Sequence, residues 1–83
     1  IGAHADLAVC STSMTFDAPD ALDDFEAAAF FYPFHLAHLG LHERGRLSAG
    51  ETVLVHAAAG GVGSAAVQLA VAAGARVLAT VGD

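Results

Sequence analysis

The stretch VLVHAAAGGVGSAAVQLA, from Val53 to Ala70, places three glycines within four positions, between a β-branched apolar run and an alanine-rich run. These glycines are Gly60, Gly61 and Gly63. A bare backbone at a strand-to-helix junction allows another group to approach more closely than a Cβ atom would permit. The stretch therefore predicts a strand, a tight turn and a helix, with some group held close to the turn.

The residues around this turn complete a strand-helix-strand pattern. Thr52 to Ala57 is apolar and β-branched, as expected of a parallel strand that is buried on both faces. Ser64 to Ala73 has the apolar spacing of a helix, and Gly74 follows it as a left-handed stop. Arg76 to Val81 is a second apolar strand. We therefore expect one right-handed βαβ unit over Thr52 to Val81.

The first turn of this helix should attract an anion. Its N–H groups lack partners within the helix, and the helix dipole adds about half a positive charge there. Gly60 would let a pyrophosphate approach the backbone, and Gly63 would let the helix lie close to the strand, as in the dinucleotide-binding fingerprint. Ala58 replaces the first fingerprint glycine, so a merely tight turn is the alternative. No lysine follows Gly63, which disfavours a phosphoryl-transfer loop.

The sequence before the βαβ unit indicates short elements. Asp6 to Val9 and Met14 to Phe16 resemble two extended segments on either side of a Ser-Thr-Ser turn. Asp23 and Glu26 have capping-box spacing, which predicts a short helix over Asp24 to Phe30.

A second helix is expected to begin near Pro33, because the first helical turn does not need the missing N–H of proline. This helix would run to about Arg44 and end at Gly45. Phe34, Ala37 and Leu41 would form its apolar stripe.

Composition excludes several classes of protein. The net charge is −6 and lysine is absent, so the electrostatic attraction that drives nucleic-acid binding is lacking. No run approaches the roughly 18 uninterrupted apolar residues of a membrane span. The single Cys10 cannot form an internal disulfide, and we interpret it as a buried or half-buried small apolar residue in a reducing, cytoplasmic protein. The chain starts at Ile1 and ends just after an apolar strand, so we expect it to be a piece of a larger protein.

Three histidines in the predicted second helix are candidate metal ligands. His35, His38 and His42 share a helix face and could in principle hold a metal ion. An ordinary polar stripe is the stronger interpretation, because no carboxylate or cysteine completes a ligand set, and we predict no metal site. His56 is interpreted as a packed histidine at a strand end rather than as an acid or base.

The segments GETVLVHAAAGGVG (Gly50 to Gly63) and AVQLA (Ala66 to Ala70) closely resemble the medium-chain dehydrogenase/reductase superfamily. Within it they resemble the zinc-free quinone oxidoreductase, or zeta-crystallin-like, branch. The resemblance implies an α/β chain that carries the end of a GroES-like catalytic domain (residues 1–22), connecting helices (23–47), and the start of a Rossmann dinucleotide-binding domain (48–83).

The same resemblance implies an NADPH-dependent enzyme that transfers hydride to a quinone or conjugated carbonyl and forms a homodimer. Catalytic residues are not assigned, and the fragment alone is expected to be inactive. Leu36 stands where relatives often have a threonine near the nicotinamide, and Val71 where they often have a lysine. A non-catalytic nucleotide-binding or structural protein on the same fold is the alternative, which Leu36 slightly favours. The implied cofactor-binding residues are Ala58, Ala59, Gly60, Gly61, Val62, Gly63, Thr80, Val81 and Gly82.

The cofactor preference depends on the tip of the second strand. An acidic residue about 20 positions beyond the last fingerprint glycine binds the ribose 2′-hydroxyl of NAD. Asp83 has this spacing from Gly63, but the strand pattern places Val81 at the tip. NADPH is therefore expected, with a ribose role for Asp83 as the alternative.

Overall fold

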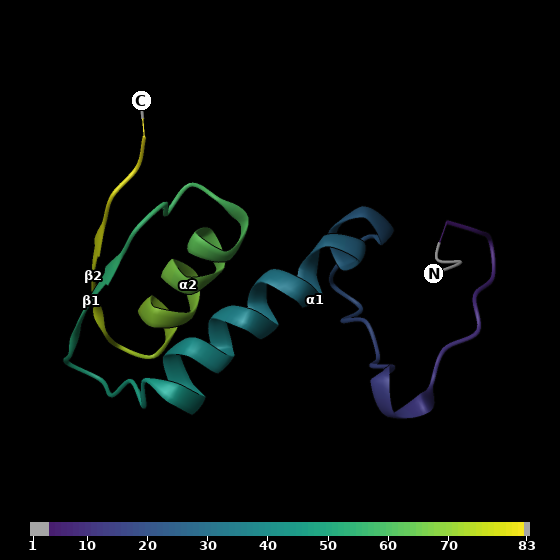
Figure 1. Ribbon diagram of the computed structural model, residues 1–83, viewed down its shortest axis with the longest axis horizontal. Helices are drawn as coiled ribbons and strands as arrows, with labels where there is room; N and C mark the ends of the chain where they lie inside the picture. The colour runs from purple at the N-terminus through teal and green to yellow at the C-terminus, as the bar shows by residue number, and fades with distance from the viewer. Residues whose placement is uncertain (1–3, 83) are drawn as a thin grey trace.

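The structure is a computed structural model that describes residues 4–82. A βαβ unit forms its C-terminal half, a long helix precedes this unit, and a mostly irregular segment precedes the helix (Figure 1). The elements in chain order are η1 (Thr12–Met14), α1 (Asp24–His38), η2 (Leu39–Arg44), β1 (Thr52–Val55), α2 (Gly61–Ala72) and β2 (Arg76–Ala79).

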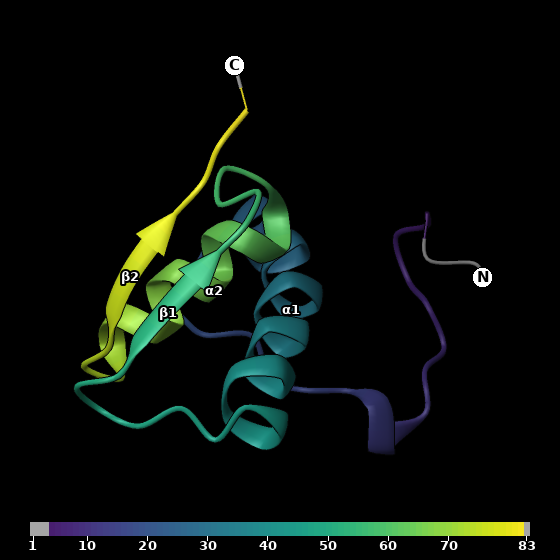
Figure 2. The same ribbon diagram turned by 60° about the vertical axis from the view of Figure 1, so that its left-hand side comes forward.

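The predicted βαβ unit is confirmed, but its second strand ends at Ala79 and not at the predicted Val81, because the backbone bonds to β1 stop with that of the Thr80 amide to the Val55 carbonyl. β1 and β2 are parallel, in a register that pairs Thr52 with Arg76 and Val55 with Ala79. α2 connects them and packs on one face of the pair, and α1 packs on the far side of α2 (Figures 1 and 2). The loop from β1 to α2 lies at the same edge as the end of β2 (Figure 2).

Local backbone conformation explains where these elements differ from prediction. β1 ends at Val55 rather than Ala57, because Ala57 has a φ of 54°, in the left-handed region that no strand residue adopts. α2 begins at Gly61, one turn before the predicted Ser64. Gly74 has a φ of 83°, which confirms it as the left-handed stop after the helix.

The prediction that the first strand is buried on both faces is wrong within this chain. Val55 is buried, but Leu54 and Leu78 are 56% and 51% exposed. α2 covers one face of the two-stranded sheet, and no other described element covers the opposite face.

The start of α1 agrees with the sequence pattern. Asp23 Oδ1 accepts a hydrogen bond from the Glu26 amide at 2.8 Å, and Glu26 Oε1 accepts one from the Asp23 amide at 3.0 Å. This reciprocal capping box satisfies two donors that the first helical turn would otherwise leave without partners.

The predicted division into two helices at Pro33 is wrong, because α1 continues through Pro33 to His38. Proline removes one hydrogen bond from a helix interior. Pro33 is half-buried against α2, where its Cγ would lie 4.0 Å from a Cβ at Gly61. We attribute the continuous helix to this packing, which offsets the lost bond.

After His38 the helix widens into the π-helical η2, in which the Gly45 amide donates to the Gly40 carbonyl at 2.9 Å. Gly45 ends it, as predicted. The predicted stripe is also confirmed, since Ala37 is buried and Phe34 and Leu41 are half-buried.

The predicted extended segments before α1 are not strands. Thr12–Met14 forms the short helix η1, in which the Met14 amide donates to the Ser11 carbonyl at 3.0 Å. Strands form only beside a partner, and residues 4–22 lie away from the sheet (Figure 1). Cys10 is exposed, so its interpretation as a buried or half-buried residue is wrong.

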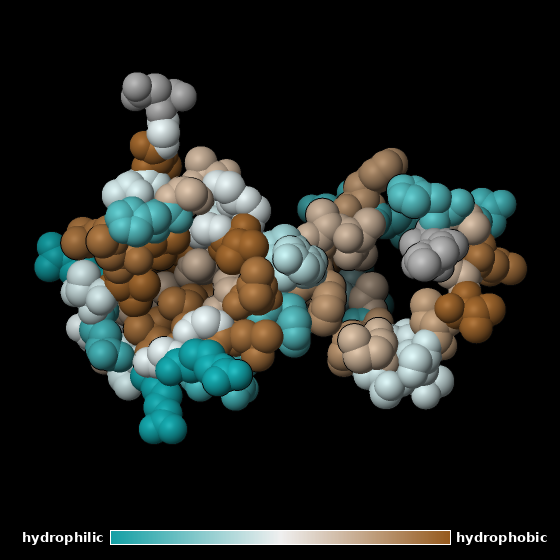
Figure 3. Space-filling model, in the orientation of Figure 1, coloured by the Kyte–Doolittle hydropathy of each residue, from teal (hydrophilic) through white to brown (hydrophobic). Residues whose placement is uncertain are grey.

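The core consists of small side chains, since the buried apolar residues are Ala37, Val55, Ala65 and Ala70. Larger apolar side chains lie at the surface over the strands and helices (Figure 3). Within residues 4–82, no helix has both the length and the apolar character that crossing a membrane requires.

Candidate functional site

The loop between β1 and α2 leaves no space for a side chain at Gly63. A Cβ there would overlap the Ala57 carbonyl oxygen and would lie 2.9 Å from Ala57 C and Ala58 Cα. The loop is closed by a hydrogen bond from the Gly60 amide to the Ala57 carbonyl at 3.0 Å. The first turn of α2 therefore lies directly against the loop, and this close approach requires glycine.

The N-terminus of α2 differs from that of α1. Its cap residue, Gly60, has extended backbone and no side chain to accept from the first-turn N–H groups. The first turn also carries no acidic residue. The free N–H groups and the positive end of the helix dipole are therefore left for an external anion.

A cleft of about 500 Å³ opens beside this helix end. Its walls are mostly apolar and come from the end of α1, from β1 and from the first turn of α2. Four of the predicted cofactor residues, Gly60 to Gly63, line it. Leu36 lines it from α1 and is 44% exposed. The volume lies within the range of small-molecule pockets, about 300–1,000 Å³.

The end of β2 is tied to the same loop. The Ala58 amide donates to the Thr80 carbonyl at 2.9 Å, and the Thr80 amide donates to the Val55 carbonyl at 3.0 Å. His56 Nδ1 lies 3.0 Å from Thr80 Oγ1. The structure thus brings the predicted residues of the loop and of the β2 tip to one edge of the sheet.

His56 also lies at this edge, in a contact with Thr80 that the sequence interpretation missed. It is exposed rather than packed, and it reaches across to the hydroxyl of Thr80. Its position directly after the first strand was a usable signal, because carboxyl ends of parallel strands meet at one edge.

The other sequence candidates are placed as follows in the structure. Thr80, Val81 and Gly82 are exposed beyond the end of β2, and Asp83 lies outside the described residues. Val71 is 59% exposed on α2.

The three helix histidines do not converge. The ring of His35 stacks on Phe31 with centroids 4.8 Å apart, whereas the rings of His38 and His42 are 4.9 Å apart. Among residues 4–82, no three histidine, cysteine or acidic side chains are grouped as metal ligands would be.

The chain is similar in sequence to polyketide synthases. It is 51% identical over 81 residues to erythronolide synthase EryA2 of Saccharopolyspora erythraea. The match covers 98% of this chain and 2% of that protein. No family model matches the chain. Since the match covers 2% of EryA2, the chain spans only a small part of this relative.

Solved structures also resemble the chain, and it covers about a fifth of each. The CurF ER cyclopropanase from the curacin A pathway matches with a TM-score of 0.83 and 45% identity, over 88% of this chain and 22% of that one. JamJ enoyl reductase matches with a TM-score of 0.83 and 44% identity, over 88% and 22%. The quinone oxidoreductase of Thermus thermophilus, solved also with NADPH, matches with a TM-score of 0.73 and 50% identity, over 80% and 22%.

These matches confirm the predicted fold class, an α/β chain from the end of a GroES-like domain through connecting helices to the first βαβ unit of a Rossmann sheet. They include both enoyl reductases and a quinone oxidoreductase, so they do not single out the quinone reductase branch.

Proposed function

We propose that this chain is the opening cofactor-binding segment of an oxidoreductase that transfers hydride from NADPH to the conjugated double bond of an enoyl substrate. The observation that carries the proposal is the N-terminus of α2, which has no side-chain cap. It lies directly against the loop because Gly63 has no side chain. It suits a pyrophosphate, which needs N–H donors and close backbone approach.

The protein residues would bind and orient, while the cofactor would supply the chemistry. The first-turn amides of α2 would hold the pyrophosphate, and Thr80, Val81 and Gly82 would lie near the adenosine ribose. Leu36 would give the cleft an apolar wall that excludes water. When bound, NADPH would supply a hydride to the β-carbon of the substrate, and water would supply the proton that the α-carbon takes up.

Two observations support these choices. Val81 lies two residues beyond the end of β2 at Ala79, and its side chain would not repel a 2′-phosphate as an acidic residue would. Enoyl reductases are among the solved structures that resemble the chain, and its sequence relatives include polyketide synthases. We therefore favour an enoyl group over a quinone. A quinone is the second candidate, because the quinone oxidoreductase of Thermus thermophilus is 50% identical to the chain over the matched part.

We also propose the domain organisation implied by the sequence, with residues 1–22 ending a catalytic domain, 23–47 connecting, and 48–83 opening the cofactor domain. α1 and η2 together run from Asp24 to Arg44, which supports a connecting segment over residues 23–47. A homodimer is proposed from the family resemblance, and a cytoplasmic location from the single cysteine, Cys10.

The test is NADPH oxidation by the full-length protein with matched panels of enoyl thioesters, enones and quinones. Faster turnover of the enoyl thioesters is expected. Faster turnover of quinones would favour the second candidate. Binding of NADPH without turnover of any acceptor would favour the non-catalytic alternative.

A further inference from the structure

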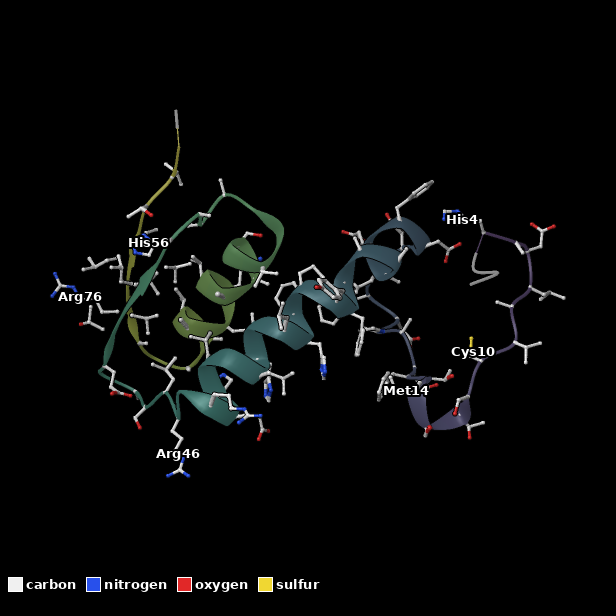
Figure 4. The ribbon with its side chains drawn as sticks, in the orientation of Figure 1. His4, Cys10, Met14, Arg46, His56 and Arg76 are labelled. Atoms are coloured by element: carbon white, nitrogen blue, oxygen red, sulfur yellow. The ribbon has the colours of Figure 1, made fainter. Side chains whose placement is uncertain are left out.

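His56 and Thr80 form a side-chain pair across the tips of the two strands. Nδ1 of His56 and Oγ1 of Thr80 are 3.0 Å apart, and both residues are exposed. The backbone of Thr80 is fixed on both sides by its hydrogen bonds to Val55 and Ala58. Figure 4 shows His56 beside the end of β2. The hydroxyl of Thr80 is therefore held in place and open to a ligand.

The direction of this hydrogen bond decides what the hydroxyl can offer. If Nδ1 carries a hydrogen, it donates to Oγ1, and the hydroxyl hydrogen is free to be donated to a ligand. If Nδ1 carries none, the hydroxyl donates to it, and only oxygen lone pairs are left for a ligand. The two forms of the imidazole thus present a donor or an acceptor at the same point.

The two nicotinamide cofactors differ in what they need at this point. The 2′-phosphate of NADPH is an acceptor, whereas the 2′-hydroxyl of NADH can donate or accept. The arginines are not placed to bind a phosphate at the strand tips. Arg76 begins β2 opposite Thr52, and Arg44 and Arg46 follow α1. Arg46 lies well below His56, away from the strand tips (Figure 4).

We infer that His56 is a positioning residue for cofactor specificity, which orients the hydroxyl of Thr80 so that it donates to the 2′-phosphate of NADPH. The inference rests on the proposed function, since it requires a nicotinamide cofactor at the strand tips. With His56 donating from Nδ1, Thr80 donates to the phosphate. NADH gains little from this arrangement, because its ribose hydroxyl can pair with either form.

The test compares two amide substitutions in the full-length protein. The amide of His56→Asn can take the place of Nδ1 and donate to Thr80, whereas the amide of His56→Gln takes the place of Nε2 and does not reach. Dissociation constants for NADPH and NADH are measured by calorimetry for both variants, for Thr80→Val and for the wild type.

His56→Gln leaves the Thr80 hydroxyl free to rotate out of its donating orientation and should weaken NADPH binding by up to about tenfold, the scale of one hydrogen bond to a charged group. NADH binding should stay within about twofold, which also reports that the variant is folded. His56→Asn should keep most of the NADPH affinity. Thr80→Val removes the donor itself and should lose at least as much NADPH affinity as His56→Gln. Adding His56→Gln to Thr80→Val should cost nothing more, because the hydroxyl that His56 orients is then already gone.

Equal losses for NADPH and NADH in His56→Gln would overturn the inference, as would equal NADPH affinities of the Asn and Gln variants. A wild type that prefers NADH would also overturn it. A wild type that binds neither cofactor would overturn the proposed function itself, and the inference with it.

Discussion

The missing side chain of Gly63 determines how closely α2 approaches the loop after β1. A Cβ at Gly63 would overlap the Ala57 carbonyl oxygen, whereas a Cβ at Gly61 would meet only Pro33 Cγ at 4.0 Å. Gly63→Ala should therefore lower the free energy of unfolding of the full-length protein by about 1–3 kcal/mol, as overpacking does. Gly61→Ala is the matched control, and alanine should be neutral or slightly stabilising there. Equal urea midpoints of the two variants would contradict this account of the loop.

Val81 provides a test of cofactor preference. A carboxylate at the tip of β2 would hydrogen-bond the free ribose hydroxyls and repel a 2′-phosphate. Val81→Asp should shift the preference from NADPH toward NADH by about 1–3 kcal/mol, the scale of a charged hydrogen bond.

Val71→Asp serves as the control for this change, because Val71 and Val81 have similar exposures of 59% and 66% but Val71 lies on α2. Ratios of the two dissociation constants, measured by calorimetry, decide the matter. The choice of Val81 as the tip residue is wrong if its variant keeps the NADPH preference of the wild type.

At the scale of elements, the capping box holds the start of α1. Asp23→Ala removes the acceptor for the Glu26 amide and should lower the free energy of unfolding by about 1 kcal/mol. Asp17→Ala removes the same exposed carboxylate outside the helix, and its effect should stay below about 0.5 kcal/mol. Denaturation followed by circular dichroism measures both. Indistinguishable midpoints would show that the cap does not stabilise the helix.

The elements that local sequence determines could be predicted. The βαβ unit follows from β-branched runs and glycines, and the capping box from the spacing of Asp23 and Glu26. Elements that depend on distant contacts could not. Packing on α2 carries the helix through Pro33, and the segments before α1 have no strand beside them among the described residues.

The same limit applies to the candidate site. The glycines of the loop were predictable, because only a close approach explains a bare backbone at Gly60 and Gly63. The exposure of Cys10 and the contact of His56 with Thr80 were not, because both depend on which segments the fold places next to them.

At the scale of the whole molecule, much apolar surface is left uncovered. Leu54 and Leu78 are exposed on the open face of the sheet, and Phe25 is 89% exposed on α1. Large apolar side chains left exposed in this way are typical of surfaces that contact other protein surfaces. The chain covers about a fifth of the solved structures that it resembles. Its binding properties are therefore best measured in the full-length protein.

The most direct test of the central claim is calorimetric titration of NADPH into the full-length wild type and into Gly63→Val. The claim is that the loop and the N-terminus of α2 hold the cofactor pyrophosphate. We expect the wild type to bind and Gly63→Val to lose binding, because its side chain would push α2 off the loop, while the circular dichroism spectrum keeps most of its helical signal. Equal NADPH affinities of the two proteins would contradict the claim.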